Sequence, residues 1–452
     1  MTVRLRPALR IPAYPTPPDA LPSIALRRAT APDIQTDVAA VSRWAFLAVS
    51  VLILAAGTGP ARAEPQTFEE ALARAAADAP GLRAGALGVE AAQASAEAAG
   101  RLPDPRLKFG LNGFPVTGPS AVRFDEVMMT NVQVGLQQDV PSRARRRAER
   151  GIARADINVA RAREDISLWQ VRAATGQAWI DLHYAERRLE VLDDLLVSLE
   201  PLWETAPSGV ASGASRPAQI LGPVELRAAL DDRRDGLRAD LARARAELSR
   251  WTGDPVPSAS GPPPAIDLEP GAFDVDLNGL PALRAYAAFS DRAEADLDLA
   301  RAGRRPDWSF EASYARRDPM FGDLVSVGAS VRLPLFQSSR QEPVIAARAA
   351  DARRVDAEQE AAERQWTAML RGDLADYEVA RTRWIRARDV VLPNLRTRAD
   401  LETASYGAGR AGIMDVLDAF TALANARLDA LDKEADVARR AVGLTLTYRS
   451  DQ

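Results

Sequence analysis

The sequence contains no cysteine and only one histidine, His183, among its 452 residues. The lack of cysteine excludes disulfide bridges, thiolate zinc sites, iron–sulfur clusters and cysteine nucleophiles. One histidine cannot supply a multi-histidine metal site, and any Ser-His-Asp triad would have to use it. Because His183 lies within a helical stretch, we expect it to be a surface or packing residue.

A surplus of charge of either sign is also lacking. The 58 basic and 62 acidic residues give a net charge of −4. Nucleic-acid binding needs a basic excess on one face, so no nucleic-acid partner is expected. The sequence has no Walker A loop and no HExxH, GxSxG or GxGxxG motif. We therefore expect no catalytic residues, no metal site and no cofactor, and predict that the protein is not an enzyme.

Long apolar runs are missing apart from one near the N-terminus, residues 44–56. Arg43 precedes it, and Ala61-Arg62-Ala63 follows as a small-x-small cleavage site. The run is short for a membrane span, so residues 41–63 are typical of a signal peptide cleaved after Ala63. The alternative is a buried helix of the mature fold. Because no cysteine follows the run, we expect no lipid anchor.

Residues 1–40 are Pro-rich and loosely basic, which is unusual for the start of a signal peptide. We suspect that translation starts further downstream, with Val41 as one possible initiator. The extended N-terminus and signal peptide together cover residues 1–63.

The rest of the chain repeats itself. We place a first repeat at residues 64–255 and a second at residues 280–452, joined by a linker or equatorial segment at 256–279. Matching segments recur at an offset near 200 residues, for example Pro80-Gly81-Leu82-Arg83-Ala84 with Pro281-Ala282-Leu283-Arg284-Ala285. Two copies are too few for a solenoid, so a duplicated supersecondary unit is the better interpretation.

Each repeat has the pattern helix, two strands, then helix and helix. The longest helical stretches run from about 144 to 204 and from about 343 to 406, with apolar residues at three-to-four spacing. Pro201 and Pro393 lie near their ends, where proline is expected to stop or kink a helix. A helix of roughly 60 residues reaches about 90 Å, which suits a coiled coil or a wall of helices. Two Pro-, Gly- and Ser-rich linkers are expected at 206–217 and 252–279.

Four segments alternate between apolar and polar residues, which predicts strands with one apolar and one polar face. They lie at about 105–114, 130–140, 307–316 and 323–334. Each is near the length of a tilted strand that crosses a bilayer. In lipid every backbone polar group must be paired, and four strands cannot close a barrel alone. Either the strands form a soluble sheet with one face on helices, or three chains pool twelve strands.

At this point the chain resembles the TolC-type outer-membrane factor family over essentially all of residues 67–446. The similarity begins at Thr67-Phe68-Glu69-Glu70-Ala71-Leu72. It is most specific at Tyr406-Gly407-Ala408-Gly409 and at Ile413-Met414-Asp415-Val416-Leu417-Asp418-Ala419. The resemblance implies a homotrimer with a β-barrel in the outer membrane and a long α-helical barrel crossing the periplasm. It also implies an equatorial domain and docking to a periplasmic adaptor and an inner-membrane RND-type pump.

Several segments look most like the heavy-metal cation efflux branch of that family. They are Leu102-Pro103-Asp104-Pro105-Arg106, Asn112-Gly113-Phe114-Pro115, Met128-Met129 and Gln137-Gln138-Asp139-Val140-Pro141. The resemblance implies a passive exit duct for heavy-metal cations, and selection of the ion would rest with the pump. Drug efflux or type I protein secretion by the same family is the alternative within it.

The resemblance also implies site residues. Asp415 and Asp418, three apart on one helical face, match acidic rings at the family's periplasmic entrance. In a threefold assembly such carboxylates would form a cation-selective constriction. Tyr406 matches a gate-latch position, whose basic partner would be Arg410, one place before the family's arginine position. The alternative is that both are surface aspartates near a helix N-terminus, where the helix dipole favours carboxylates.

Two functions of other classes remain open. A periplasmic adaptor would show one helical hairpin flanked by lipoyl-like β-rich halves. A periplasmic coiled-coil scaffold would have no membrane strands. The resemblance instead predicts a mainly helical fold with a small β part, in which each chain gives four strands and long helices.

Overall fold

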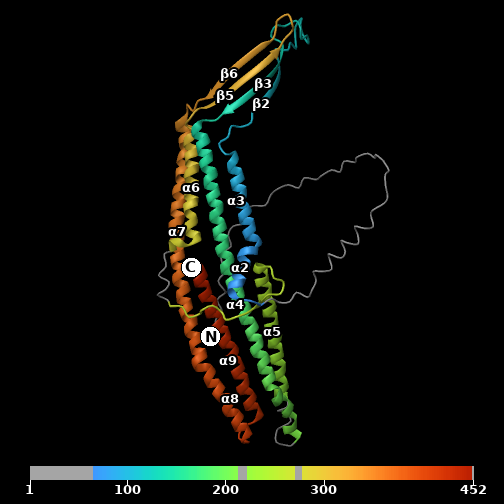
Figure 1. Ribbon diagram of the computed structural model, residues 1–452, viewed down its shortest axis with the longest axis vertical. Coiled ribbons are helices and arrows are strands. Elements are labelled where there is room, and N and C mark those ends of the chain that lie inside the picture. Colours follow the sequence, from blue (N-terminus) through green and yellow to red (C-terminus); the bar gives the residue numbers. More distant parts are fainter. Residues whose placement is uncertain (1–64, 212–220, 270–276, 450–452) are drawn as a thin grey trace, which may run out of the picture. The chain divides into compact units, whose positions relative to one another are not determined.

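The computed structural model describes residues 65–211, 221–269 and 277–449 (Figure 1). The chain divides into Met1–Pro60 and Ala61–Gln452, and every described residue belongs to the second unit. The predicted signal peptide, its cleavage site and the possible initiator Val41 lie outside the described residues. Within the described ranges, no helix combines the length and the apolar character that a membrane span requires.

The same order of elements occurs twice. The first series is α3 (Pro80–Ala98), β2 (Arg106–Asn112), β3 (Asn131–Val140), α4 (Arg143–Ala211) and α5 (Leu221–Thr252), with α2 (Phe68–Asp78) before it. The second is α6 (Pro281–Ala302), β5 (Asp307–Arg316), β6 (Leu324–Arg332), α7 (Gln337–Arg386), α8 (Leu392–Gly407) and α9 (Ile413–Tyr448). The two series lie in one compact unit, and β3 pairs directly with β5.

Helix α4 has 69 residues and, at 1.5 Å per residue, spans roughly 100 Å. Pro201 does not stop this helix, because α4 continues to Ala211. Proline at 201 leaves the Val197 carbonyl without its helical donor. Val197 is 75% exposed, so water can satisfy that carbonyl. The linker predicted at 206–217 accordingly begins later than expected.

The second long helical segment, α7 with α8, accommodates Pro393 in a different way. Between α7 and α8 lies a π-helical turn, Ala387–Val391, and Pro393 follows at the start of α8. The π turn shifts the hydrogen-bond pattern by one residue, so the missing proline N–H is absorbed without ending the helix. Arg388 stacks over Trp384 at 4.5 Å and pairs with Asp389 beside this turn.

The four long strands form one antiparallel sheet in the order β2-β3-β5-β6. Each lies within a segment where alternation predicts a strand. The register places apolar residues opposite one another, as in the pairs Phe109–Val134, Val134–Tyr314 and Tyr314–Val325. One face of the sheet is therefore predominantly apolar, interrupted only near its ends by Gln138 and Arg316.

The helices pack through three apolar clusters along α9. Near the junction of α2 and α4, Trp179 is fully buried, and its indole nitrogen donates to the Gln66 carbonyl at 2.9 Å. A second cluster joins α7 to α9 around Tyr377, and a third joins α4, α5 and α9 around Leu195. Gly176 allows close approach of α4 and α9, since a Cβ there would lie 2.5 Å from a methyl group of Leu446.

The linker after α5 is held against both repeats. The short strand β4 (Ser258–Ala259) pairs in parallel with β1 (Pro65–Gln66). The Glu186 carboxylate of α4 accepts a hydrogen bond from the Ala259 amide at 3.2 Å. Further on, the Tyr377 hydroxyl of α7 accepts from the Leu268 amide at 2.7 Å and donates to the Ile266 carbonyl at 2.8 Å. The linker thus bridges α4 and α7.

Candidate functional site: the amphipathic sheet and the helix tips

The sheet's apolar face is open to the surroundings. Phe109, Val325 and Val327 are 74%, 75% and 83% exposed, and other large apolar side chains of this face are also exposed. Among the described elements, no helix packs across the sheet. The alternative of a soluble sheet with one face on helices therefore does not fit this arrangement.

The opposite face is polar, and on the central strands β3 and β5 its residues are less exposed than those of the apolar face. Arg106 pairs with Asp139 at 2.6 Å, and Lys108 with Glu311 at 2.9 Å. Gln137 donates to the Ser309 hydroxyl at 2.8 Å. Along β5 the polar-face residues are buried or half-buried while the apolar-face residues are exposed. This is the reverse of a water-soluble sheet, whose apolar face is normally the covered one.

Both edges of the sheet are free in the single chain. Strand β2 pairs only with β3, and β6 only with β5, within the described residues. Each edge strand therefore presents a row of backbone N–H and C=O groups without ladder partners. Exposed edges of this kind are templates for strands of another chain.

At the far end of the helices, α8 and α9 are joined by a turn at residues 408–412 in which Gly409 has a φ of +69°. Asp415 and Asp418 lie on the exposed face of α9, opposite the buried Ile413, Val416 and Leu417. The Asp415 carboxylate accepts a hydrogen bond from the amide of Gly412 at 2.8 Å. Asp415 thus caps the helix. Because its carboxylate is also exposed, it could still take part in the predicted ring of carboxylates from three chains.

Tyr406 lies just before this turn and Arg410 lies within it, and both are exposed. Neither side chain has a hydrogen bond or ion pair to a described residue. The structure does not bring the two together as a latch within one chain. A latch between helices of different chains stays a prediction, as does the acidic ring.

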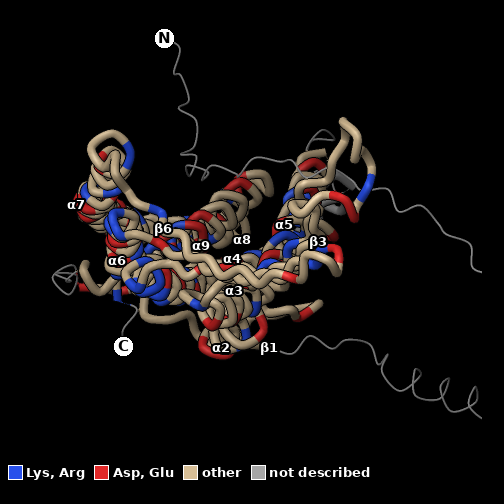
Figure 2. The backbone as a smooth tube through the Cα atoms, turned by 90° about the horizontal axis from the view of Figure 1, so that it is seen from above, with Lys and Arg blue, Asp and Glu red and all other residues tan. Residues whose placement is uncertain are grey.

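The tip of α9 lies beside the start of α5. A Cβ at Gly222 would fall 2.6 Å from the Met414 methyl group, so glycine permits this close contact. Above it, Arg188 of α4 pairs with Asp432 at 2.7 Å, and Arg233 of α5 donates to Asn425 at 2.6 Å. Basic and acidic residues are interspersed along the helices (Figure 2).

His183 is a packing residue, as expected. Its ring is buried and stacks on Trp179, with centroids 5.1 Å apart and planes at 13°. Burial, aided by the charge of Arg187, lowers the pKa of His183 below its ordinary value. In the described part of the chain, no three His, Asp or Glu side chains gather as a metal site.

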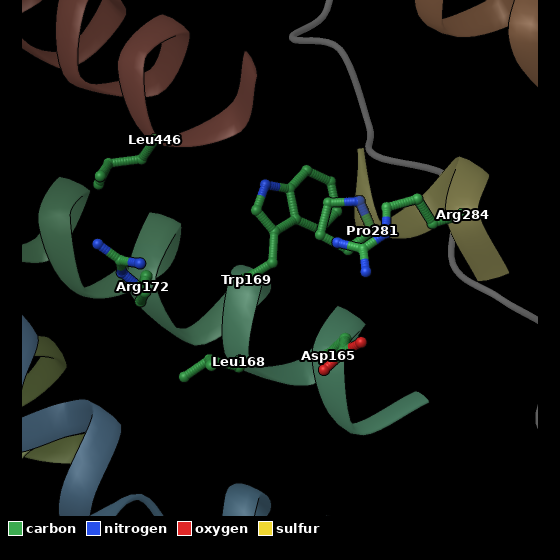
Figure 3. Close-up of a pocket in the computed structure, with 7 residues that line it drawn as sticks. All are labelled: Asp165, Leu168, Trp169, Arg172, Pro281, Arg284 and Leu446. Atoms are coloured by element: carbon green, nitrogen blue, oxygen red, sulfur yellow. The ribbon is translucent and has the colours of Figure 1, made fainter. Parts of the chain in front are cut away.

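A pocket of about 260 Å³ lies where α4, α6 and α9 meet (Figure 3). Trp169 lies near Pro281 on one side, and its indole nitrogen donates to the Thr447 carbonyl at 3.2 Å. Arg172, Arg284 and Asp165 line the rim. Because the indole N–H already has a hydrogen-bond partner within the fold, we interpret this pocket as a gap between packed helices and not as a ligand site.

Residues 276–447 match the model of the family described as outer membrane efflux protein. This match covers the second repeat. No curated protein sequence matches the chain.

The fold of both repeats matches solved structures of membrane proteins and outer membrane channels. A membrane protein from Pseudomonas aeruginosa is 17% identical with a TM-score of 0.70, covering 84% of this chain and 90% of that one. A structure of CusC, described in connection with transmembrane channel formation, is 14% identical with a TM-score of 0.70, covering 84% and 91%. The CmeC outer membrane channel of Campylobacter jejuni is 13% identical with a TM-score of 0.68, covering 84% and 85%.

This fold, mainly helical with a small sheet, is the predicted fold class. The adaptor alternative required one helical hairpin between β-rich halves, whereas the chain has two strand hairpins in one sheet and paired helices in each repeat. Sequence reasoning missed the fastening of the linker by Glu186 and Tyr377. It also missed an arginine-lined recess at the junction of sheet and helices, for which the run Arg145-Arg146-Arg147 was the available signal.

Proposed function

We propose that this chain forms, as a homotrimer, the outer-membrane exit duct of a tripartite efflux system. The observation that carries the proposal is the amphipathic sheet, whose apolar face is exposed and not packed by any described helix. An exposed apolar face of this extent needs lipid or another apolar surface against it. In lipid, the two open edges must also be paired. Three chains bring twelve strands, which is enough to close a barrel with the polar face inward.

The long helices fit the same assembly. They extend from the end of the sheet at which β3 leads into α4 and β6 leads into α7. At roughly 100 Å, the longest of these helices is long enough to cross much of the periplasm. Three chains would place α4 and α5, and α7 to α9, around one axis. The duct is passive, because it offers a water-filled path and performs no chemistry.

At the helix tips, threefold symmetry would turn Asp415 and Asp418 into rings of carboxylates. Both are exposed and share one helix face, as such rings require. Tyr406 and Arg410, lacking partners among the described residues, are free to bond to a neighbouring chain and latch the closed entrance. We propose that a periplasmic adaptor and an inner-membrane RND-type pump act at this end.

The cargo we propose is heavy-metal cations. This rests on the sequence segments between residues 102 and 141 that resemble the heavy-metal branch, and the chain itself only conducts. Deleting the gene should lower resistance to copper, silver, zinc, cobalt or cadmium salts while leaving drug sensitivity unchanged. Increased sensitivity to drugs alone would contradict the cargo proposal and leave the duct proposal standing.

Targeting follows from the same proposal. The signal peptide at about 41–63 would deliver the chain through the inner membrane, after which the sheet would insert in the outer membrane without a lipid anchor. N-terminal sequencing of the mature protein should begin after Ala63.

A pair of neighbouring substitutions on β6 tests the duct directly. Val327 belongs to the apolar face and Ser326 to the polar face, and both are exposed in the single chain. Val327→Arg should cost about 2–4 kcal/mol per chain in a bilayer and reduce outer-membrane assembly. Ser326→Arg, with its side chain toward water, should assemble normally.

The readout is the amount of protein retained in the outer-membrane fraction after a carbonate wash. Equal retention of the two variants would contradict the proposal, because a water-facing sheet would accept arginine at either position.

A further inference from the structure

A basic recess lies directly beneath the apolar face of the sheet. It has a volume of about 670 Å³ and is bounded by the end of β3, the start of α4 and the turn between α6 and β5. Four arginines and no acidic residue line it: Arg143, Arg146, Arg147 and Arg305. For a chain with a net charge of −4, this is a local excess of positive charge.

These arginines have no ion pair to a described residue, although acids are near. Asp307 and Glu149 are engaged on the other side of the junction, where Arg145 pairs with them at 3.5 Å and 3.1 Å. Asp307 also accepts a hydrogen bond from the amide of Ser142 at 2.8 Å. The Nε of Arg146 is buried without a hydrogen-bond partner in the described part of the chain.

The position of the recess indicates the kind of ligand it would meet. Its wall includes Trp308, an exposed residue of the sheet's apolar face that pairs across the sheet with Val140 and Val331. That row is the last apolar row before the helices begin. Tryptophan is the residue typical of the membrane–water interface, and arginines placed just beyond an apolar span meet the lipid phosphates. The N-terminus of α4 adds a positive dipole end to the same recess.

We propose that this recess binds the phosphodiester headgroup of an anionic phospholipid in the membrane leaflet that meets the helices. The proposal rests on the membrane insertion of the sheet proposed above. Arginine is suited to it because its planar guanidinium can donate two hydrogen bonds to one phosphate. The recess volume lies within the range of small-ligand sites, roughly 300–1,000 Å³.

The test uses the full chain in detergent, titrated by calorimetry with short-chain phosphatidylglycerol, short-chain phosphatidylcholine and inorganic phosphate. Phosphatidylglycerol should bind about tenfold more tightly than phosphatidylcholine or more, because several arginines act on one anionic headgroup. Raising the salt concentration should weaken the preference. Inorganic phosphate should bind weakly and compete poorly.

Three quadruple variants define the site. Changing Arg143, Arg146, Arg147 and Arg305 to Gln should abolish the preference for phosphatidylglycerol. Changing the same four to Lys should keep most of it, which separates loss of charge from loss of fold. The matched control changes Arg238, Arg243, Arg354 and Arg364 to Gln, since these exposed arginines lie in surface ion pairs on α5 and α7. It should bind like the parent.

Equal binding of the two lipids, or a preference that survives the Gln variant, would overturn the proposal. Equally tight binding of inorganic phosphate would also overturn it, in favour of a free anion. Insertion into vesicles of phosphatidylcholine alone is measured alongside. A chain that inserts there but shows no lipid preference refutes only the headgroup site, whereas a chain that inserts into no vesicle refutes the duct as well.

Discussion

At the scale of single residues, His183 makes the pH response of the fold predictable. Burial lowers its folded-state pKa, which favours the neutral ring that stacks on Trp179. Because the folded-state pKa of His183 is the lower one, the unfolded chain binds more protons than the folded chain once the pH falls below the unfolded-state pKa, about 6.5. The stabilisation is therefore complete above that value and is lost as the pH falls through it.

We expect denaturant unfolding of the parent to show a steeper loss of stability between pH 7.5 and pH 5 than His183→Gln. Glu186 acts in the opposite direction, since burial raises its pKa and protonation then favours the folded state. Because Glu186 is common to both proteins, the difference between the two pH profiles isolates the histidine. Parallel profiles would show that His183 is not buried in its neutral form.

The two aspartates at the α9 tip can be tested without disturbing the helix cap. Asp415→Asn with Asp418→Asn keeps an oxygen that can accept the Gly412 amide while removing both charges. In planar bilayers we expect weaker cation block and reduced cation selectivity of the single channel, because the ring potential is lost.

The matched control is Asp235→Asn with Asp240→Asn on α5, where both carboxylates pair with arginines of the same helix. If the tip variant and the control show the same conductance properties, Asp415 and Asp418 do not form the constriction.

At the scale of elements, Tyr377 carries the attachment of the linker to α7. Tyr377→Phe would leave the Leu268 amide and the Ile266 carbonyl without their partner, at a cost of about 1–3 kcal/mol. We expect a lower unfolding temperature and faster hydrogen exchange at Leu268. Tyr406→Phe, which alters an exposed ring without a described partner, should leave both unchanged. Unaltered exchange in the Tyr377 variant would mean that the linker is held elsewhere.

The elements also show what sequence patterns can and cannot predict. The strands were predictable because a period of two survives in each short segment, as between Val132 and Leu136. The first long helix was predicted to end near residue 204, but α4 passes Pro201 and continues to Ala211. The second was predicted to continue to about residue 406, and α8 ends at Gly407 after a π turn that accommodates Pro393. The basic recess could not be foreseen, since Arg305 joins Arg143, Arg146 and Arg147 only when β3 and β5 pair.

At the scale of the whole molecule, the fold recurs at 13–17% identity in the solved structures compared above. Identical side chains are therefore not what preserves it. The shared requirement is a pattern: alternating strands whose apolar sides align, and helices whose small and apolar residues pack as along α9. The proposed trimer would give partners to the sheet edges that the single chain leaves unpaired within the described residues.

The central claim is that these strands are completed by two further copies of the chain. The most direct measurement is the protein mass of the detergent-extracted complex, by light scattering with detergent correction or by native mass spectrometry. The account predicts three chain masses, and none of the protein in solution when detergent is withdrawn. A stable, water-soluble species of one chain mass would contradict it.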